Sequence, residues 1–169
     1  MRIQIAFRAC LIFCIVLFLS AYAQERKIAK KDVPGPVTSA FQKSYPQAEI
    51  RGYAKEMEGG KIYYEIESMN GKMSLDALYF PDGSLAEVEE GISPADLSPL
   101  VKEGVSVKHA HATITRAEKT TLGDKITYEL QLTAGKTKWS MEVDHTGRVL
   151  KDSMHRAKNN HSGSESRED

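Results

Sequence analysis

Apolar and polar residues alternate along four stretches between positions 49 and 89, a period of two that is typical of β-strands. Turn residues separate the stretches, and they include Asn70-Gly71 and Asp82-Gly83. Because these pairs tolerate the positive φ angles of tight hairpin turns, the pattern predicts an antiparallel meander. The expected strands are Glu49 to Met57, Lys61 to Ser68, Lys72 to Phe80, and Ser84 to Glu89.

A different apolar period precedes the meander and predicts a helix. Val37, Ala40, Phe41 and Tyr45 follow one another at helical spacing, so they would form a single apolar stripe. The helix is expected to open at Val33-Pro34, where a proline fits the first turn, and to end before Pro46.

The meander occurs twice. The segment Gly59 to Glu87 returns without a gap as Gly123 to Lys151, 64 positions later, and eight positions are identical, mainly turn glycines and strand residues. The chain is therefore predicted to be an α+β protein, a tandem repeat of a helix packed on an antiparallel β-meander. The second helix is expected to open at Ser93-Pro94 and to continue through Leu97 to Val101, an offset of 60 rather than 64.

The alternation also predicts which side of the sheet is buried. Apolar residues keep their character in both copies on one face, and we expect the helices to cover that face. Its predicted members are Ile62, Tyr64, Ile66, Leu75, Ala77 and Tyr79, with counterparts Ile126, Tyr128, Leu130, Trp139, Met141 and Val143.

The opposite face differs between the copies. Leu78 and Phe80 of the first copy become Glu142 and Asp144 in the second, and Tyr63 is predicted to lie on the same face. An apolar patch on an open sheet face can mark a protein-binding surface, so these three residues are the candidate partner contacts. The alternative is that the two repeats pack against each other there, or that the N-terminal lead-in covers the patch.

The two ends of the chain are predicted to lie outside the fold. Residues 1–23 combine arginines, an apolar run and a small-residue cleavage site, which is typical of a secretory signal peptide; the run is short for the alternative of a membrane anchor. Residues 24–32 are expected to be a flexible lead-in, 33–91 the first repeat, 92–153 the second, and 154–169 a disordered polar tail. The protein is thus expected to be periplasmic or secreted.

Composition narrows the function classes for the mature chain. Both cysteines, Cys10 and Cys14, lie in the predicted signal peptide, so neither disulfides nor thiol chemistry is expected afterwards. Removing Arg2 and Arg8 with that peptide leaves 21 basic against 23 acidic residues, a formal charge of −2. With this balance of charges the chain lacks the excess of basic residues that is typical of nucleic-acid-binding proteins. A strong attraction to an anionic membrane is not expected either.

The combined pattern resembles a known family. Val33-Pro34, a short helix ending at Tyr45-Pro46, strands around a Lys-Ile-x-Tyr-Glu core and an Asp-Gly or Thr-Gly turn resemble PepSY-like domains, and more closely the secreted β-lactamase-inhibitor-like, PepSY-like proteins. The resemblance covers about Asp32 to Ser153. It implies tandem helix-plus-sheet units, a role in binding or inhibiting an extracytoplasmic enzyme, and no catalytic residues.

Two groups of side chains could carry other chemistry. His109 and His111 form a His-x-His pair that would project from one face of a strand, a spacing that metal sites use. No third ligand is evident in the sequence, although His145 or Glu118 could approach in the fold, and the alternative is a pair of solvated or half-buried side chains. Glu56, Glu58, Glu65 and Glu67 could be paired carboxylates for acid–base catalysis, but their spacing is more typical of a solvated sheet face.

Two hypotheses follow. The first is a secreted, non-enzymatic module without a cofactor that binds a protein partner through Tyr63, Leu78 and Phe80. It could thereby inhibit or regulate an extracytoplasmic enzyme. The second is a periplasmic sensor or carrier of a metal ion or small ligand that uses His109 and His111. No nucleophile motif such as Gly-x-Ser-x-Gly, and no His-Glu-x-x-His, is present in the sequence.

Overall fold

A computed structural model describes residues 25–155, which form one antiparallel sheet of nine strands with two α-helices. Every strand pairs with its neighbours in the sequence, so the sheet is a continuous meander. The first half contains β1 (Arg26–Lys27), the 3-10 turn η1 (Lys30–Asp32), α1 (Gly35–Ser44), β2 (Glu49–Glu58), β3 (Lys61–Asn70), β4 (Met73–Tyr79) and β5 (Leu85–Ile92). The second contains η2 (Pro94–Asp96), α2 (Pro99–Lys108), β6 (Thr113–Leu122), β7 (Lys125–Ala134), β8 (Thr137–Asp144) and β9 (Val149–His155).

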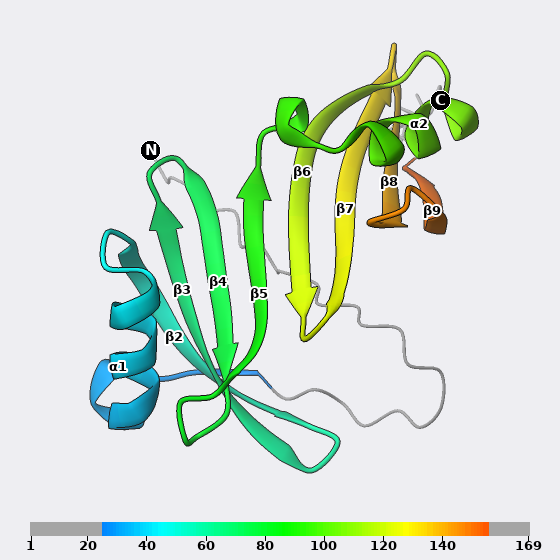
Figure 1. Ribbon diagram of the computed structural model, residues 1–169. Helices are drawn as coiled ribbons and strands as arrows, with labels where there is room; N and C mark the ends of the chain where they lie inside the picture. Colours follow the sequence, from blue (N-terminus) through cyan, green and yellow to red (C-terminus); the bar gives the residue numbers. More distant parts are fainter. Residues whose placement is uncertain (1–24, 156–169) are drawn as a thin grey trace, which may run out of the picture.

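Both helices lie on the same side of this sheet. Val88 of β5 belongs to the core under α1, and Ile92 of β5 packs against the core under α2. Because residues four apart in a strand point the same way, the two cores share one face. In Figure 1, α1 lies over the first strands of the sheet and α2 crosses the later ones. The predicted α+β class, with a helix on each antiparallel meander, is confirmed.

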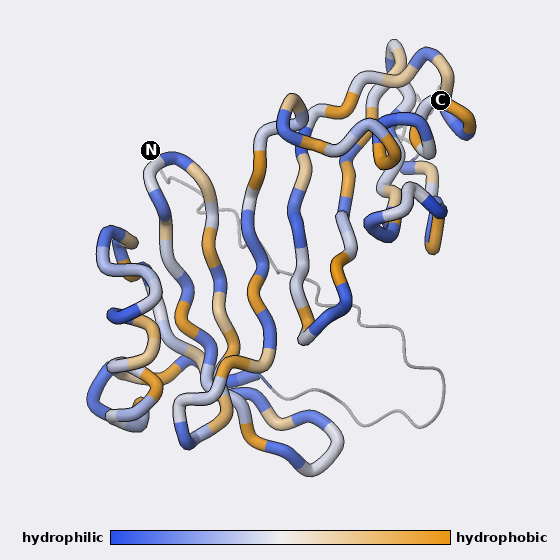
Figure 2. Tube along the Cα trace, viewed as in Figure 1, coloured by the Kyte–Doolittle hydropathy of each residue, from blue (hydrophilic) through white to orange (hydrophobic). Residues whose placement is uncertain are grey.

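The two cores contain the residues that the alternation predicted. Ile66, Leu75, Ala77 and Tyr79 are buried against Val37 and Phe41 of α1 in the first half. Their counterparts Leu130, Met141 and Val143 are buried against Val101 and Val105 of α2, with Trp139 and Tyr128 packed on the cluster. The alternation of apolar and polar residues along the strands is visible in Figure 2.

The repeat has an offset of 64 throughout, so the predicted offset of 60 for the second helix is wrong. α1 begins at Gly35 and α2 begins at Pro99. Ser93-Pro94 opens the 3-10 turn instead, where the Ser93 hydroxyl accepts a hydrogen bond from the Ala95 amide at 3.2 Å. The helix is capped by Ser98, whose hydroxyl accepts a hydrogen bond from the Val101 amide at 3.3 Å.

The segment predicted as a flexible lead-in is part of the sheet. Arg26 and Lys27 pair with Lys55 and Ala54, and Ile28 packs on the first core. In the second half β5 has the position that β1 has in the first. Glu90 and Gly91, which lie 64 positions after Arg26 and Lys27, pair with Lys119 and Glu118 of β6. β5 therefore ends one repeat and supplies the first strand of the next, which joins the halves edge to edge.

Two glycines allow the second helix to approach the sheet closely. Gly147, in the turn before β9, has φ +85°, and a Cβ there would lie 2.1 Å from the Leu100 carbonyl oxygen. A Cβ on Gly104 of α2 would lie 2.0 Å from the Gly147 carbonyl oxygen. The position equivalent to Gly104 in the first half is Ala40, so only the second helix requires a glycine there.

The predicted segments at the two ends of the chain lie partly outside residues 25–155. The predicted signal peptide at 1–23, with Cys10 and Cys14, lies outside the described residues, as does the predicted tail from position 156 onward. β9 continues to His155, so the second repeat extends beyond the predicted boundary at 153. No helix in the described part of the chain is long and apolar enough to cross a membrane.

Candidate functional site on the open face of the first half

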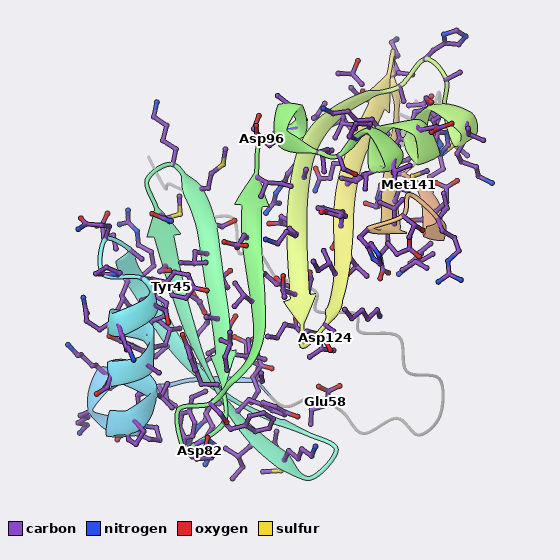
Figure 3. All side chains as sticks on the ribbon, in the orientation of Figure 1. Tyr45, Glu58, Asp82, Asp96, Asp124 and Met141 are labelled. Atoms are coloured by element: carbon purple, nitrogen blue, oxygen red, sulfur yellow. The ribbon has the colours of Figure 1, made fainter. Side chains whose placement is uncertain are left out.

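The three predicted partner contacts lie on the face of the sheet that the helices leave uncovered. The rings of Tyr63 and Phe80 are in contact, with centroids 5.1 Å apart. Leu78 lies between Glu65 and Glu87 across neighbouring strands. All three side chains are partly exposed. Tyr63 pairs with Glu56, two residues before Glu58, and Phe80 comes two residues before Asp82; Figure 3 labels Glu58 and Asp82.

The two halves do not pack face to face over this patch. They share the β5–β6 pairing and continue one sheet, which contradicts the alternative that the repeats cover each other there. β1 pairs with β2 at the edge of the sheet, on the far side of β3 from β4. Among residues 25–155, therefore, the lead-in extends the sheet rather than crossing the aromatic pair.

Carboxylates surround the apolar patch, and several of them are buried. Glu56 is 6% exposed, Glu65 4% and Glu87 7%, so the prediction of a solvated sheet face is wrong for Glu56 and Glu65. Sequence reasoning missed Glu87, and also Asp76 and Glu89, although the spacing of Glu87 and Glu89 repeats that of Glu65 and Glu67 on a nearby strand.

Three acidic residues lie side by side across the middle of this face. Glu67 of β3 pairs with Asp76 of β4, and Asp76 pairs with Glu89 of β5. We call these three residues the acid row. Lys27 forms an ion pair with Glu67, and Asp76 Oδ1 accepts a hydrogen bond from the Ser68 amide at 3.2 Å, so interactions within the chain hold these two members of the row.

Burial and mutual repulsion raise the pKa of these carboxyl groups. The pKa of Glu65 is raised to about 8, first by burial and then by Glu56, Asp76 and Glu25, while Lys27 acts in the opposite direction. The pKa of Glu89 is raised to about 7, again first by burial and then by nearby carboxylates, of which Glu87 has the largest effect. The pKa of Asp76 is also raised, mainly by burial. Near neutral pH this face therefore carries less negative charge than its composition suggests.

Glu56 is the least satisfied member of the group. Its Oε1 atom is buried without a hydrogen-bond partner among the described residues. Burial raises the pKa of Glu56, and Glu25, Glu58 and Glu87 raise it further. A buried polar atom without a partner costs about 1–3 kcal/mol, so this oxygen is an unfavourable feature of the fold.

Lys27 balances one edge of the acidic face. Its ammonium group forms ion pairs with Glu25, at 3.3 Å, and with Glu67. Glu25, Glu65 and Glu67 are also the group within residues 25–155 whose carboxylate oxygens lie close enough together, within 4.8 Å, for a cation. Since Lys27 already contacts two of the three, the arrangement is an ion-pair cluster closed by the chain itself.

The histidine pair lies elsewhere and is not on a strand. His109 follows the last residue of α2, and His111 lies in the turn before β6, so the predicted strand is wrong. His109 Nε2 is 3.1 Å from Asp152 of β9, and its ring is 4.7 Å from that of Trp139. In the described part of the chain, neither histidine belongs to a group of three potential metal ligands, and neither His145 nor Glu118 completes one with them.

Comparison with known proteins places this fold among bacterial proteins. No family model matches the chain, and no curated protein matches its sequence. A protein of Bacteroides eggerthii described as a candidate periplasmic protein superposes with a TM-score of 0.57 at 15% identity, over 72% of this chain and 88% of that one. A DUF2874 family protein from Bacteroides uniformis gives 0.56 at 13% identity, over 72% and 88%. A BLIP-like protein from Bacteroides fragilis gives 0.54 at 15% identity, over 76% and 92%. At these identities the likeness is one of fold.

Proposed function

We propose that this protein is a secreted or periplasmic, non-enzymatic binding module that holds a protein partner on the open face of its first half. By this proposal the partner packs on Tyr63, Leu78 and Phe80, and binding inhibits or regulates an extracytoplasmic enzyme. The observation that carries the proposal is the difference between the halves: the helix-covered faces match, and the open faces do not.

The chemistry of the patch supports a protein partner. Tyr63 and Phe80 form a preassembled aromatic pair at the surface, and aromatic residues dominate the energetics of protein interfaces. In the second half, Thr127 and Asp144 stand at the positions of Tyr63 and Phe80. The open face therefore presents this aromatic pair in the first half only.

The fold likeness supports the proposal at a coarser level. One of the similar structures is BLIP-like and another is described as a candidate periplasmic protein, which agrees with the predicted signal peptide. The alternative of a metal or small-ligand carrier has no comparable support. His109 is held by Asp152 and Trp139, and His111 lies in a separate turn position.

The proposal is tested by affinity capture from the periplasmic and secreted fractions of the native host. Protein with Tyr63→Ala and Phe80→Ala is compared with wild type, and a matched control carries Thr127→Ala and Glu142→Ala on the corresponding face of the second half. We expect one extracytoplasmic enzyme to be captured by wild type and control and lost with the aromatic variant, and its activity to fall on addition of wild type. Capture that survives loss of both aromatic rings would contradict the proposal.

A further inference from the structure

β9 is the last strand of the sheet, and within residues 25–155 only β8 pairs with it. Its counterpart β5, 64 positions earlier, has a strand on each side. β4 pairs with β5 in the same register as β8 with β9, and β6 pairs with the other side of β5 over six residue pairs. β9 therefore presents, at the edge of the sheet, the backbone groups with which β5 pairs to β6.

The opposite edge of the sheet contains the strand that corresponds to β6. This strand is β2, and its outer neighbour β1 pairs with it at only two residues, Lys55 and Ala54. Met57 and Glu58 have no strand on their outer side in the described part of the chain, although their counterparts in β6 pair with β5. One copy of the chain thus has the two surfaces of a β5–β6 junction at its two ends.

The register of the β5–β6 junction can be transferred to β9 of one copy and β2 of another by the 64-residue shift. The pairs Glu90–Lys119 and Glu89–Thr120 then become Met154–Lys55 and Ser153–Glu56. On the helix-covered side Met154 is 53% exposed and Met57 48%, and the two would be diagonal neighbours across the new junction. Joining the copies would remove both exposed apolar side chains from water.

The same register would improve the surroundings of Glu56. Its Oε1 atom has no hydrogen-bond partner among the described residues, and Glu25 raises its pKa more than any other carboxylate does. Ser153 of the second copy would take the place of Glu25, which exchanges a repelling charge for a hydroxyl that can donate a hydrogen bond. That hydroxyl now makes a long bond of 3.3 Å to the Ser140 carbonyl. His155, which can also carry positive charge, would take the place of Lys27.

We propose that the protein associates head to tail with a second copy of itself, and that β9 of one copy replaces β1 of the next and pairs with β2 in the register of the β5–β6 junction. The sheet then continues from copy to copy, as it already does from the first half to the second. Because the two joined surfaces differ, the contact does not close on itself and further copies can add. The inference is independent of the proposed function.

Disulfide trapping tests the register, since both cysteines of the sequence lie in the predicted signal peptide. The chain is purified after export in three forms, Lys55→Cys, Met154→Cys and the control Met73→Cys, which changes another exposed methionine. Directly paired strand residues have Cα atoms about 4.5–5.5 Å apart, within the range of a disulfide. We expect Met154→Cys mixed with Lys55→Cys to give a linked heterodimer in at least about tenfold higher yield than Met73→Cys mixed with Lys55→Cys.

Charge changes at position 154 test the same contact without cysteines, and the exposure of this side chain should leave the fold intact. Met154→Glu would place opposite Lys55 the kind of ion pair that Glu90 and Lys119 form across the β5–β6 junction at 2.7 Å, whereas Met154→Lys would place like charges opposite each other. In sedimentation velocity over a concentration series, we expect Met154→Glu to associate about threefold more tightly than wild type and Met154→Lys about threefold more weakly.

Three results would overturn the inference. The first is a wild type that stays monomeric up to about 1 mM. The second is a heterodimer yield no higher than that of the Met73→Cys control. The third is a disulfide that forms only between two Met154→Cys chains, which would indicate a symmetric contact between two β9 strands instead.

Discussion

The two halves of this protein have the same fold and different open faces. Under the helices, Ile66 corresponds to Leu130, Ala77 to Met141 and Tyr79 to Val143, and all six residues are buried. On the open face the aromatic pair, Leu78 and the acid row of the first half are replaced in the second half by other polar residues, of which only Glu142 and Asp144 are charged. The comparison separates two faces: the shared face maintains the fold, and the face that differs is the one on which we propose that a partner binds.

The largest expected effect tests whether the cores are equivalent. Ile66→Ala and Leu130→Ala remove corresponding side chains that are both fully buried, so each should lower the free energy of unfolding by about 3–4 kcal/mol. Urea denaturation of both variants measures this. A cost below about 1 kcal/mol in one half would show that the two cores do not contribute alike.

A smaller effect is expected where the helices approach the sheet differently. Gly104→Ala would place a Cβ 2.0 Å from the Gly147 carbonyl oxygen. The helix would have to move, and we expect a loss of about 2–3 kcal/mol although alanine is the better helix former. The reverse change in the first half, Ala40→Gly, should cost only about 1 kcal/mol. Thermal unfolding of the two variants measures this. A larger loss of stability from Ala40→Gly than from Gly104→Ala would contradict the packing described here.

The buried carboxylates predict a pH dependence of stability. The pKa of Glu65 rises from 4.5 to about 8 on folding, so the folded chain binds more protons over that range and is destabilised as the pH rises through it. Glu65→Gln should reduce this dependence, to which Glu89 with its pKa of about 7 also contributes, and should stabilise the protein at pH 8 by on the order of 2 kcal/mol. The Asp144 carboxyl, whose pKa is lowered to about 2, titrates well below this window.

The measurement is the melting temperature between about pH 5 and pH 8, with Glu129→Gln as the matched change in the second half. The pKa of Glu129 is also raised, first by burial, but Arg116 and Lys151 act against the shift. We therefore expect a smaller effect from Glu129→Gln. A wild-type protein whose stability increases over this range would contradict the assignment.

The smallest effect on stability is expected for the aromatic pair. Tyr63 and Phe80 are partly exposed and contact each other on the open face, so the double change to alanine should cost less than about 2 kcal/mol. A buried aromatic residue would cost about 3–5 kcal/mol by itself. A loss of that size in urea denaturation would make the pair a structural cluster rather than a binding surface.

The strands and the buried face could be predicted from the sequence because the spacing of apolar residues and the turn residues are local signals. It failed at the second helix, since Ser93-Pro94 and Ser98-Pro99 both supply a serine cap followed by proline, and only the 64-residue spacing distinguishes them. The histidine pair was misplaced for a related reason. His109 is the counterpart of Tyr45, which follows the last residue of α1, but no proline comes after His109 to mark the turn.

The candidate site was harder to predict because it depends on pairing across strands. Tyr63, Leu78 and Phe80 could be placed on one face from alternation alone. The acid row could not be recognised in the same way, because Glu67, Asp76 and Glu89 become neighbours only through the register of β3, β4 and β5. The burial of Glu56 and Glu65 likewise depends on the side chains around them, which no local pattern specifies.

The most direct test of partner binding by the first half is photo-crosslinking in the living host. A benzophenone amino acid is placed at position 78 in one strain and at the equivalent position 142 in another, so that the two probes differ only in the half of the molecule that presents them. The account predicts a discrete protein adduct from Leu78 and none from Glu142. Adducts of equal yield from both positions, or an adduct from Glu142 alone, would contradict it.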